Sequence, residues 1–232
     1  MPDISITSSL YKTEKFLPDW QKELRKFALE ADKLGLKFEV NAIANDPSNK
    51  ELSILENLNK ELWFNLHIVQ RETIYASWNR GVRLAKAPVC TAWNVDDVRN
   101  PQAIIDGLNH IKHGTELVYY PFVYKRYLTI LGVDILVKRT VVDPPSFHPI
   151  KFTKEMHCGP FYIFTKDLYE KVGPYDETFR IAGDYDWCVR AAKVSPFTKS
   201  NTIAGIFNKR DGTLSGGRNP RQLEENARIA NK

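Results

Sequence analysis

The chain has 232 residues, 43% of them hydrophobic and 12% aromatic, which is enough apolar material for the core of one globular domain. No apolar stretch reaches the roughly 18–20 residues needed to cross a bilayer, and the first ten residues lack the blocks of a secretory signal. We therefore expect a cytoplasmic protein. The three cysteines support neither a disulfide framework nor a zinc knuckle, and we expect buried thiols at Cys90, Cys158 and Cys188.

The formal net charge of +5 is concentrated near the C-terminus. From Lys199 onward the chain carries seven basic and three acidic residues. These residues form either a solvated basic tail or a cluster that meets a phosphate-bearing ligand.

Strand and helix patterns alternate through the first part of the chain. Between Pro18 and Gly35, apolar residues recur at three-to-four spacing, which predicts an amphipathic helix with both ends marked. We expect strands over 3–7, 38–44, 66–69 and 89–93, and further helices over 52–58 and 75–85. This alternation predicts an α/β fold with a mostly parallel central sheet flanked by helices. Ligands should bind at the carboxyl ends of its strands.

The middle segment, 115–157, has strand-like runs over 117–124 and 130–137 and a proline-rich stretch. Its tyrosines have two interpretations, because aromatic residues in strands either pack in the core or stack on the ring of a ligand. These are Tyr119, Tyr120, Tyr124 and Tyr127. No metal-ligand spacing supports His148 or His157, and we expect both to be structural.

Polar residues follow three of the predicted strands, where a parallel sheet would bring them together. They are Thr7, Ser8 and Ser9 after the first strand, Asn45 and Asp46 after the second, and Asn94, Asp96 and Asp97 after the fourth. Such residues also favour turns for local reasons. Two adjacent carboxylates, however, repel each other unless a positive charge lies beside them, and hard oxygen ligands suit Mg²⁺ or Mn²⁺. Asp96 and Asp97 therefore predict a divalent metal site.

Three segments together resemble the family 2 glycosyltransferases of the GT-A fold. YASWNRGVRLAKAPVCTAWNVDDVRNPQAI, residues 75–104, is similar to the stretch that carries that family's D-x-D metal motif. NDPSNKE, residues 45–51, lies where the family has a D-D-G-S-x-D loop, and residues 164–193 resemble its acceptor-side segment. The resemblance implies one GT-A domain over 1–232, with a nucleotide-sugar-binding half over 1–114. Residues 115–232 would form the acceptor-side half with its basic tail. Within this half, residues 115–157 would build the acceptor side, and their tyrosines are the ones that could stack on sugar rings.

The resemblance also implies roles for single residues. Asp97 and Asp96 would hold Mn²⁺ or Mg²⁺, and Asp184 would be the general base that deprotonates the acceptor hydroxyl. Donor contacts would come from Thr7, Ser8, Asp46, Arg71, Asp96, Lys209 and Arg210. The alternative role of Asp184 is that of a helix N-cap residue. Asp186 is either a second candidate base or the ion-pair partner of Arg190, four residues later.

The function implied is metal-dependent, inverting transfer of a sugar from a nucleoside-diphosphate sugar, with UDP-sugars favoured, to a hydroxyl of a carbohydrate or glycolipid. This reaction is typical of the synthesis of a polysaccharide or glycoconjugate. Such a function is compatible with peripheral association of the protein with a membrane. We expect no nucleic-acid partner. Two alternatives stay open: a nucleic-acid or polyanion binding module, suggested by the basic pI, and a homologue that binds donor without turnover. The latter is permitted because Asn94 replaces an acidic residue of the family's metal motif.

Overall fold

The computed structural model describes residues 1–210 and 220–230. In this part of the chain a seven-stranded sheet has the order β10-β6-β9-β4-β1-β2-β3. All its neighbouring strands are parallel except β9, which runs antiparallel to β4 and β6. The strands are β1 (Ile4–Leu10), β2 (Phe38–Asn45), β3 (Phe64–Val69), β4 (Val89–Ala92), β6 (Leu117–Tyr119), β9 (Tyr162–Thr165) and β10 (Thr198–Lys199). The predicted mostly parallel α/β architecture is confirmed.

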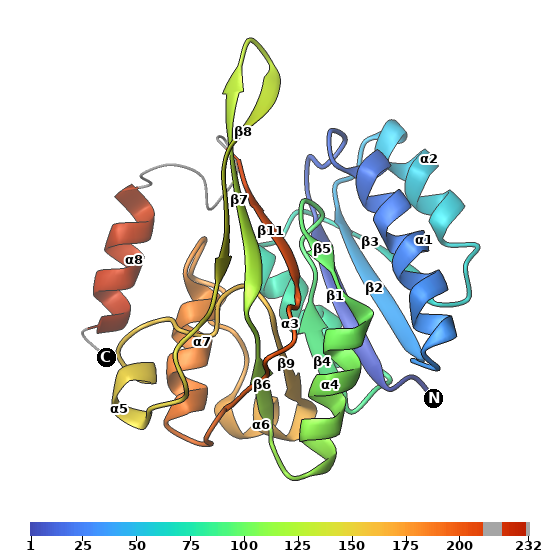
Figure 1. The fold of residues 1–232 in the computed structure, drawn as a ribbon. Coiled ribbons are helices and arrows are strands. Elements are labelled where there is room, and N and C mark those ends of the chain that lie inside the picture. The colour runs from blue at the N-terminus through green and yellow to red at the C-terminus, as the bar shows by residue number, and fades with distance from the viewer. Residues whose placement is uncertain (211–219, 231–232) are drawn as a thin grey trace.

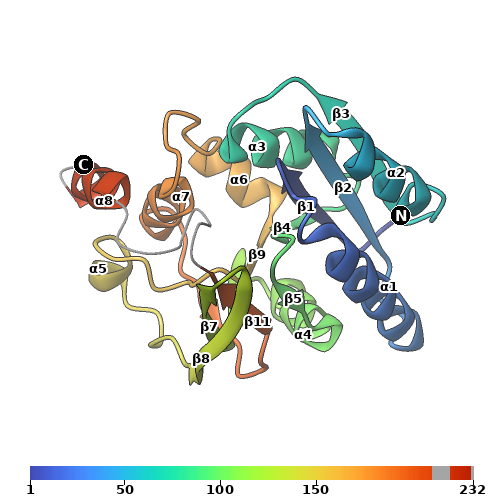
Figure 2. The ribbon, with the colours of Figure 1, turned by 90° about the horizontal axis from the view of Figure 1, so that it is seen from above.

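Helices cover both faces of this sheet, and Figure 2 shows them in two layers. One hydrophobic cluster joins the sheet to α1, α2 and α4, and a second joins it to α3, α6 and α7. The helices are α1 (Leu17–Lys33), α2 (Asn49–Leu58), α3 (Ile74–Leu84), α4 (Pro101–Lys112), α5 (Pro149–Phe152), α6 (Lys166–Val172), α7 (Gly183–Ala192) and α8 (Pro220–Ala230). In the described part of the chain, no helix has both the length and the apolar character to span a bilayer.

Helix α1 shows how the sequence pattern sets its packing. Trp20, Leu24 and Phe27 lie on one face of the helix and are buried against the sheet, as their spacing predicts. Pro18 occupies the first turn, where its missing N–H costs nothing. Gly35 has φ +70°, which glycine adopts without strain, and it ends the helix where the sequence predicted.

A second, four-stranded sheet has the order β5-β11-β7-β8, with β5 (Val98–Arg99), β11 (Gly205–Lys209), β7 (Phe122–Ile130) and β8 (Val133–Val142). The run 130–137 was predicted as one strand, and this prediction is wrong. Leu131 and Gly132 both have positive φ and form the turn of a hairpin between β7 and β8. The run 117–124 is likewise divided at Pro121 into β6 and β7, since proline has no N–H to donate to a ladder. Figure 1 shows the hairpin projecting beyond the rest of the molecule.

The three cysteines, three of the four tyrosines of the middle segment and His157 pack within the protein. All three cysteines are buried free thiols, as predicted. Tyr119 and Tyr120 are buried in the core, and Tyr124 packs against Phe207. The His157 ring lies 4.9 Å from the ring of Phe152, which it helps to pack.

Candidate functional site

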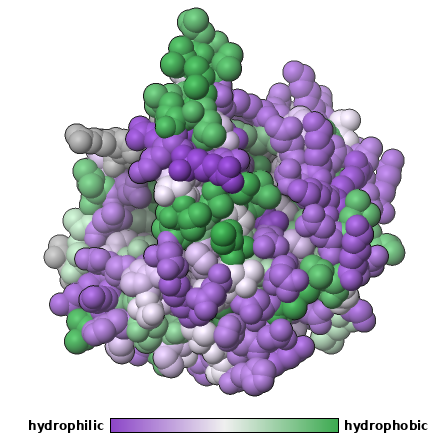
Figure 3. Space-filling view, in the orientation of Figure 1, coloured by the Kyte–Doolittle hydropathy of each residue, from purple (hydrophilic) through white to green (hydrophobic). Residues whose placement is uncertain are grey.

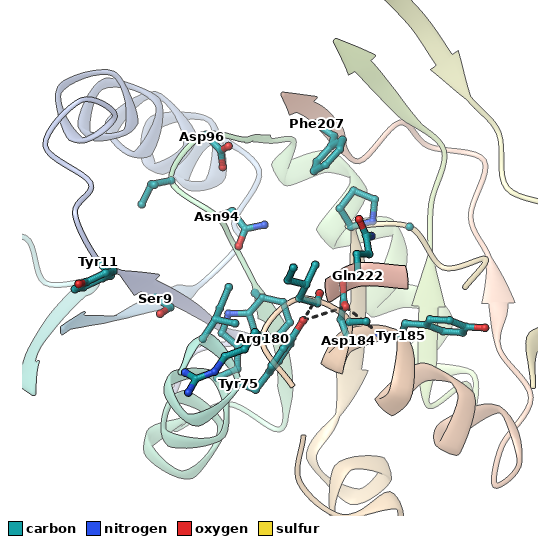
Figure 4. Close-up of a pocket in the computed structure, with 18 of the residues that line it drawn as sticks. Ser9, Tyr11, Tyr75, Asn94, Asp96, Arg180, Asp184, Tyr185, Phe207 and Gln222 are labelled. Carbon is teal, nitrogen blue, oxygen red and sulfur yellow. Dashed lines mark hydrogen bonds between the residues drawn. The ribbon is translucent and has the colours of Figure 1, made fainter. Parts of the chain in front are cut away.

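A cleft of about 940 Å³ opens where β1 and β4 end, at the carboxyl edge that the strand order predicted. Its walls come from the loop after β1, from α3, from the loop after β4, and from the first turns of α7 and α8. Asp96 and Asp184 line it from opposite sides, with Asn94 between them, as Figure 4 shows. The cleft therefore gathers two of the carboxylates that the sequence singled out.

Asp184 lies in the first turn of α7, half-buried at the inner end of the cleft. Its Oδ1 accepts hydrogen bonds from the Tyr75 hydroxyl, at 3.2 Å, and from the backbone N–H of Tyr185, at 2.9 Å. Burial raises the pKa of the Asp184 carboxyl, and these hydrogen bonds oppose but do not cancel that effect. A carboxylate with a raised pKa is a stronger base, which suits the removal of a proton from a hydroxyl. The helix N-cap alternative is not observed, since Ala182 is the N-cap residue.

The loop before Asp184 is held by a residue that the sequence did not single out. Glu225, on α8, is buried, and its carboxylate accepts hydrogen bonds of 2.9 Å from three successive backbone N–H groups, those of residues 180–182. The Tyr75 hydroxyl shares its single proton between Asp184 and the carbonyl of Ile181, which lies at 2.6 Å. Glu225 and Tyr75 together fix the entry into α7 and hence the place of Asp184.

We expect Glu225→Gln to lower the free energy of unfolding by about 1–3 kcal/mol, because at least one of the three N–H groups loses a charged acceptor. Turnover should fall as well, since Asp184 loses its positioning. Urea unfolding measures the first effect. Glu224→Gln makes the same chemical change at an exposed neighbour and is the control; equal stability of the two variants would contradict this role of Glu225.

Asp186 forms an ion pair with Arg190. In the described structure it does not line the cleft. Its Oδ2 lies 2.9 Å from Nε of Arg190, whose other nitrogens donate to the carbonyls of Val172 and Pro174. The Asp186 side chain is only 1% exposed. The pair therefore ties α7 to the segment before it.

The adjacent carboxylates Asp96 and Asp97 have different surroundings. Asp97 is buried, and its oxygens accept hydrogen bonds from the backbone N–H of Asn208, at 2.9 Å, and from the Asn94 amide, at 3.4 Å. Burial and the neighbouring Asp96 carboxylate raise the pKa of Asp97 well above its ordinary value. Asp96 lines the cleft, and burial raises its pKa too, although Arg210 partly offsets the shift. In this structure the hydrogen bonds of Asp97 join the loop after β4 to β11, whereas Asp96 lines the cleft.

Asp96 is also suited to a divalent metal. No group of three or more His, Cys, Asp or Glu side chains that could share a metal ion occurs within residues 1–210 and 220–230. Mg²⁺ and Mn²⁺ are nevertheless often held by one or two carboxylates, with water and substrate phosphates completing the shell. The desolvated Asp96 carboxylate would be stabilised by such a cation, so its surroundings fit a metal that binds together with a diphosphate.

The polar residues Thr7, Ser8 and Ser9 also differ in whether they line the cleft. The Thr7 side chain packs against α3, where Gly81 leaves room for it, and the Ser8 hydroxyl donates to the carbonyl of Trp93, at 2.8 Å. Ser9 and Tyr11 line the cleft instead. The reason is that β1 continues to Leu10, three residues beyond the predicted end, so the cleft begins further along the chain.

The loop after β2 does not line the cleft in the described structure, but its residues contact segments next to the cleft. Asp46 is exposed and has φ +42°, and Asn45 is buried and accepts from the backbone N–H of Glu72. Glu51, from the same motif, accepts hydrogen bonds from the N–H and hydroxyl of Thr13 and so anchors the loop after β1. Arg71 lies 4.4 Å from the ring of Tyr11, which places its charge at the rim of the cleft.

The two basic residues predicted on a donor-binding loop are held outside the cleft wall. Lys209 is the last residue of β11, in register with Arg126 on β7. Arg210 lies 3.4 Å from a carboxylate oxygen of Asp134 and donates to the carbonyl of Asp96. The glycine-rich residues that follow, 211–219, lie outside the described part of the chain.

Comparisons with known proteins bear on the fold. No family model matches the sequence, and no curated protein matches it significantly. The S. aureus protein TarS in complex with UDP-GlcNAc matches 99% of this chain with a TM-score of 0.73 and 16% identity, over 65% of its own chain. The mannosyltransferase PcManGT from Pyrobaculum calidifontis, in complex with GDP-Man and Mn²⁺, matches 89% of this chain with a TM-score of 0.62 and 12% identity, over 56% of its own.

At these identities the likeness establishes a shared fold, and the predicted GT-A-type α/β architecture is confirmed. This chain spans less than two thirds of the length of either solved chain.

Proposed function

We propose that the protein transfers a sugar from a nucleoside-diphosphate sugar to an acceptor hydroxyl. The observation that carries this proposal is the placement of Asp96 and Asp184 on opposite sides of one cleft at the carboxyl edge of the sheet. Sugar transfer needs a group that neutralises the leaving diphosphate and, on the other side of the anomeric carbon, a base for the incoming hydroxyl. The two carboxylates divide these tasks between them.

On the donor side, Asp96 would hold Mn²⁺ or Mg²⁺ together with the diphosphate. When bound, such a metal neutralises charge on the leaving group as a Lewis acid. Lys12, Lys15 and Arg180 also line the cleft and add positive charge for a diphosphate. Tyr11, with Arg71 over its ring, offers an aromatic surface at the rim on which a nucleobase can stack.

On the acceptor side, Asp184 takes the proton of the attacking hydroxyl. Attack from the side opposite the diphosphate, in a single displacement, inverts the anomeric centre. The residues from 1 to 114 would then form the donor half, and the later residues, with α7 and α8, the acceptor half. This arrangement fits a family 2 glycosyltransferase, and the stronger likeness to a UDP-GlcNAc complex favours a UDP-sugar as donor.

A thermal-shift screen of UDP-, GDP- and dTDP-sugars with Mn²⁺ or Mg²⁺ tests the proposal, because a ligand that binds the folded state raises the melting temperature by mass action. We expect one class of donor to give a metal-dependent shift and then to be hydrolysed slowly without acceptor. A shift without any hydrolysis or transfer would instead indicate a donor-binding homologue without turnover.

A further inference from the structure

The hairpin of β7 and β8 carries apolar side chains where they meet solvent. Leu131 at its turn is 99% exposed, Val133 is 63% exposed and Ile130 is 52% exposed. Figure 3 shows this apolar surface as a spike standing above a strongly hydrophilic band. Exposed, projecting apolar surface on a hairpin is a liability for self-pairing and aggregation, so its presence indicates a partner.

The register of the hairpin separates its two faces. Leu128 is opposite Ile135 and Ile130 is opposite Val133, so one face of the tip is entirely apolar. On the other face Thr129 lies opposite Asp134, which accepts from Lys15 at 3.0 Å. This polar face turns toward the loop that lines the cleft, and the apolar face points away from it.

Directly below the tip, five basic residues form what we call the basic collar: Lys125, Arg126, Lys138, Arg139 and Lys209. They are in register across three strands: Lys209 beside Arg126, Arg126 beside Lys138, and Lys125 beside Arg139. Like charges directly opposite each other destabilise a sheet. None of the five forms an ion pair with another of the described residues. The positive charge of the collar is therefore available to an anionic partner.

We propose that this hairpin docks the protein on an anionic membrane surface, with the apolar tip among the acyl chains and the basic collar at the lipid headgroups. An apolar end bordered by lysine and arginine is the arrangement that binds such an interface, because both apolar burial and charge attraction contribute. A second copy of the chain fits less well, since a symmetric contact through the tips would bring two basic collars together. The Lys15–Asp134 ion pair joins the hairpin to the cleft rim, so docking would bring the cleft close to the bilayer.

Sedimentation with vesicles tests this proposal. The unmodified protein should pellet with vesicles of equal parts phosphatidylglycerol and phosphatidylcholine, and much less with phosphatidylcholine alone. Ile130→Ser with Leu131→Ser should weaken binding at least about tenfold, because two apolar side chains are lost from the interface. Arg126→Gln with Lys138→Gln should weaken it about 25-fold, since each basic residue near an anionic surface contributes roughly fivefold, and added salt should mimic this loss.

Two matched variants serve as controls. Leu62→Ser removes an equally exposed leucine from the loop between α2 and β3, and Lys26→Gln with Lys33→Gln removes the same charge from α1. Both should bind vesicles as the unmodified protein does, and none of the variants should lower its melting temperature. Absence of binding to anionic vesicles, or equal losses in hairpin and control variants, would overturn the proposal. Concentration-dependent self-association that the tip variant abolishes, without vesicle binding, would assign the hairpin to a second copy instead and overturn it as well.

Discussion

Replacing Asp184 by asparagine is expected to slow sugar transfer by about 10² to 10⁴, the contribution of a positioned general base, while donor and metal affinity stay the same. Asparagine keeps the oxygen that accepts from Tyr75 and Tyr185 but cannot take a proton. Asp184 lies across the cleft from Asp96, so a diphosphate and a metal held at Asp96 would not be affected. Single-turnover kinetics with donor and metal titrations measure both quantities, once the thermal-shift screen has found a donor.

Asp186→Asn is the comparison for this variant, because it removes a carboxylate two residues away on the same helix. Asp186 is buried against Arg190, so this change should cost about 1–3 kcal/mol of stability and little of the chemical rate at a temperature where the protein is folded. Near-normal turnover in Asp184→Asn with loss in Asp186→Asn would move the base to Asp186. Loss of metal binding in Asp184→Asn would make Asp184 a ligand.

The raised pKa of Asp184 should affect the pH dependence of both the reaction rate and the stability. The acid limb of the rate profile should lie above the ordinary pKa of an aspartate, and it should disappear in Asp184→Asn. In the folded protein the protonated carboxyl is favoured, so its contribution to stability is present at low pH and is lost as the pH rises through the raised pKa. Asp184→Asn should therefore be more stable than the parent at neutral pH in urea unfolding. A less stable variant would indicate that the Asp184 carboxylate has a structural role.

Substitution of Asp96 should affect donor binding, whereas substitution of Asp97 should affect stability. Asp96→Ala is expected to weaken metal-dependent donor binding by about 100-fold or more, because a metal ligand contributes several kcal/mol, with little change in stability. Asp97→Ala is expected to lower stability by about 1–3 kcal/mol, because the buried N–H of Asn208 and the Asn94 amide lose an acceptor. Titration of donor with and without Mn²⁺, together with urea unfolding of both variants, measures these effects. If Asp97→Ala is stable and Asp96→Ala binds donor normally, the assignment of the two residues is reversed.

Periodicity predicted the sheet because the alternation of strand and helix is set by local patterns, and most of the predicted elements are within a few residues of the observed ones. It also predicted the loops that approach the cleft, since parallel strands bring their carboxyl ends together. Spacing alone does not predict which of two neighbours faces the cleft. Asp96 and Asp97, like Ser8 and Ser9, are adjacent but point in different directions, and the direction depends on contacts with β11 and β4.

Other parts of the site depend on contacts between distant segments. Glu225 supports Asp184 through the backbone of residues 180–182, more than forty residues earlier in the chain, and no motif marks such an acceptor. The hairpin turn was missed because the apolar run over 130–137 reads as a continuous strand, although Gly132 in its middle was the available signal.

We expect the cleft between Asp96 and Asp184 to bind a nucleoside diphosphate together with a divalent metal. Calorimetric titration of UDP, GDP and dTDP into the protein, each with and without Mn²⁺, measures this binding. At least one of the three should bind, Mn²⁺ should strengthen this binding, and Asp96→Ala should remove the effect of Mn²⁺. If none of the three binds under either condition, the protein does not have the proposed function.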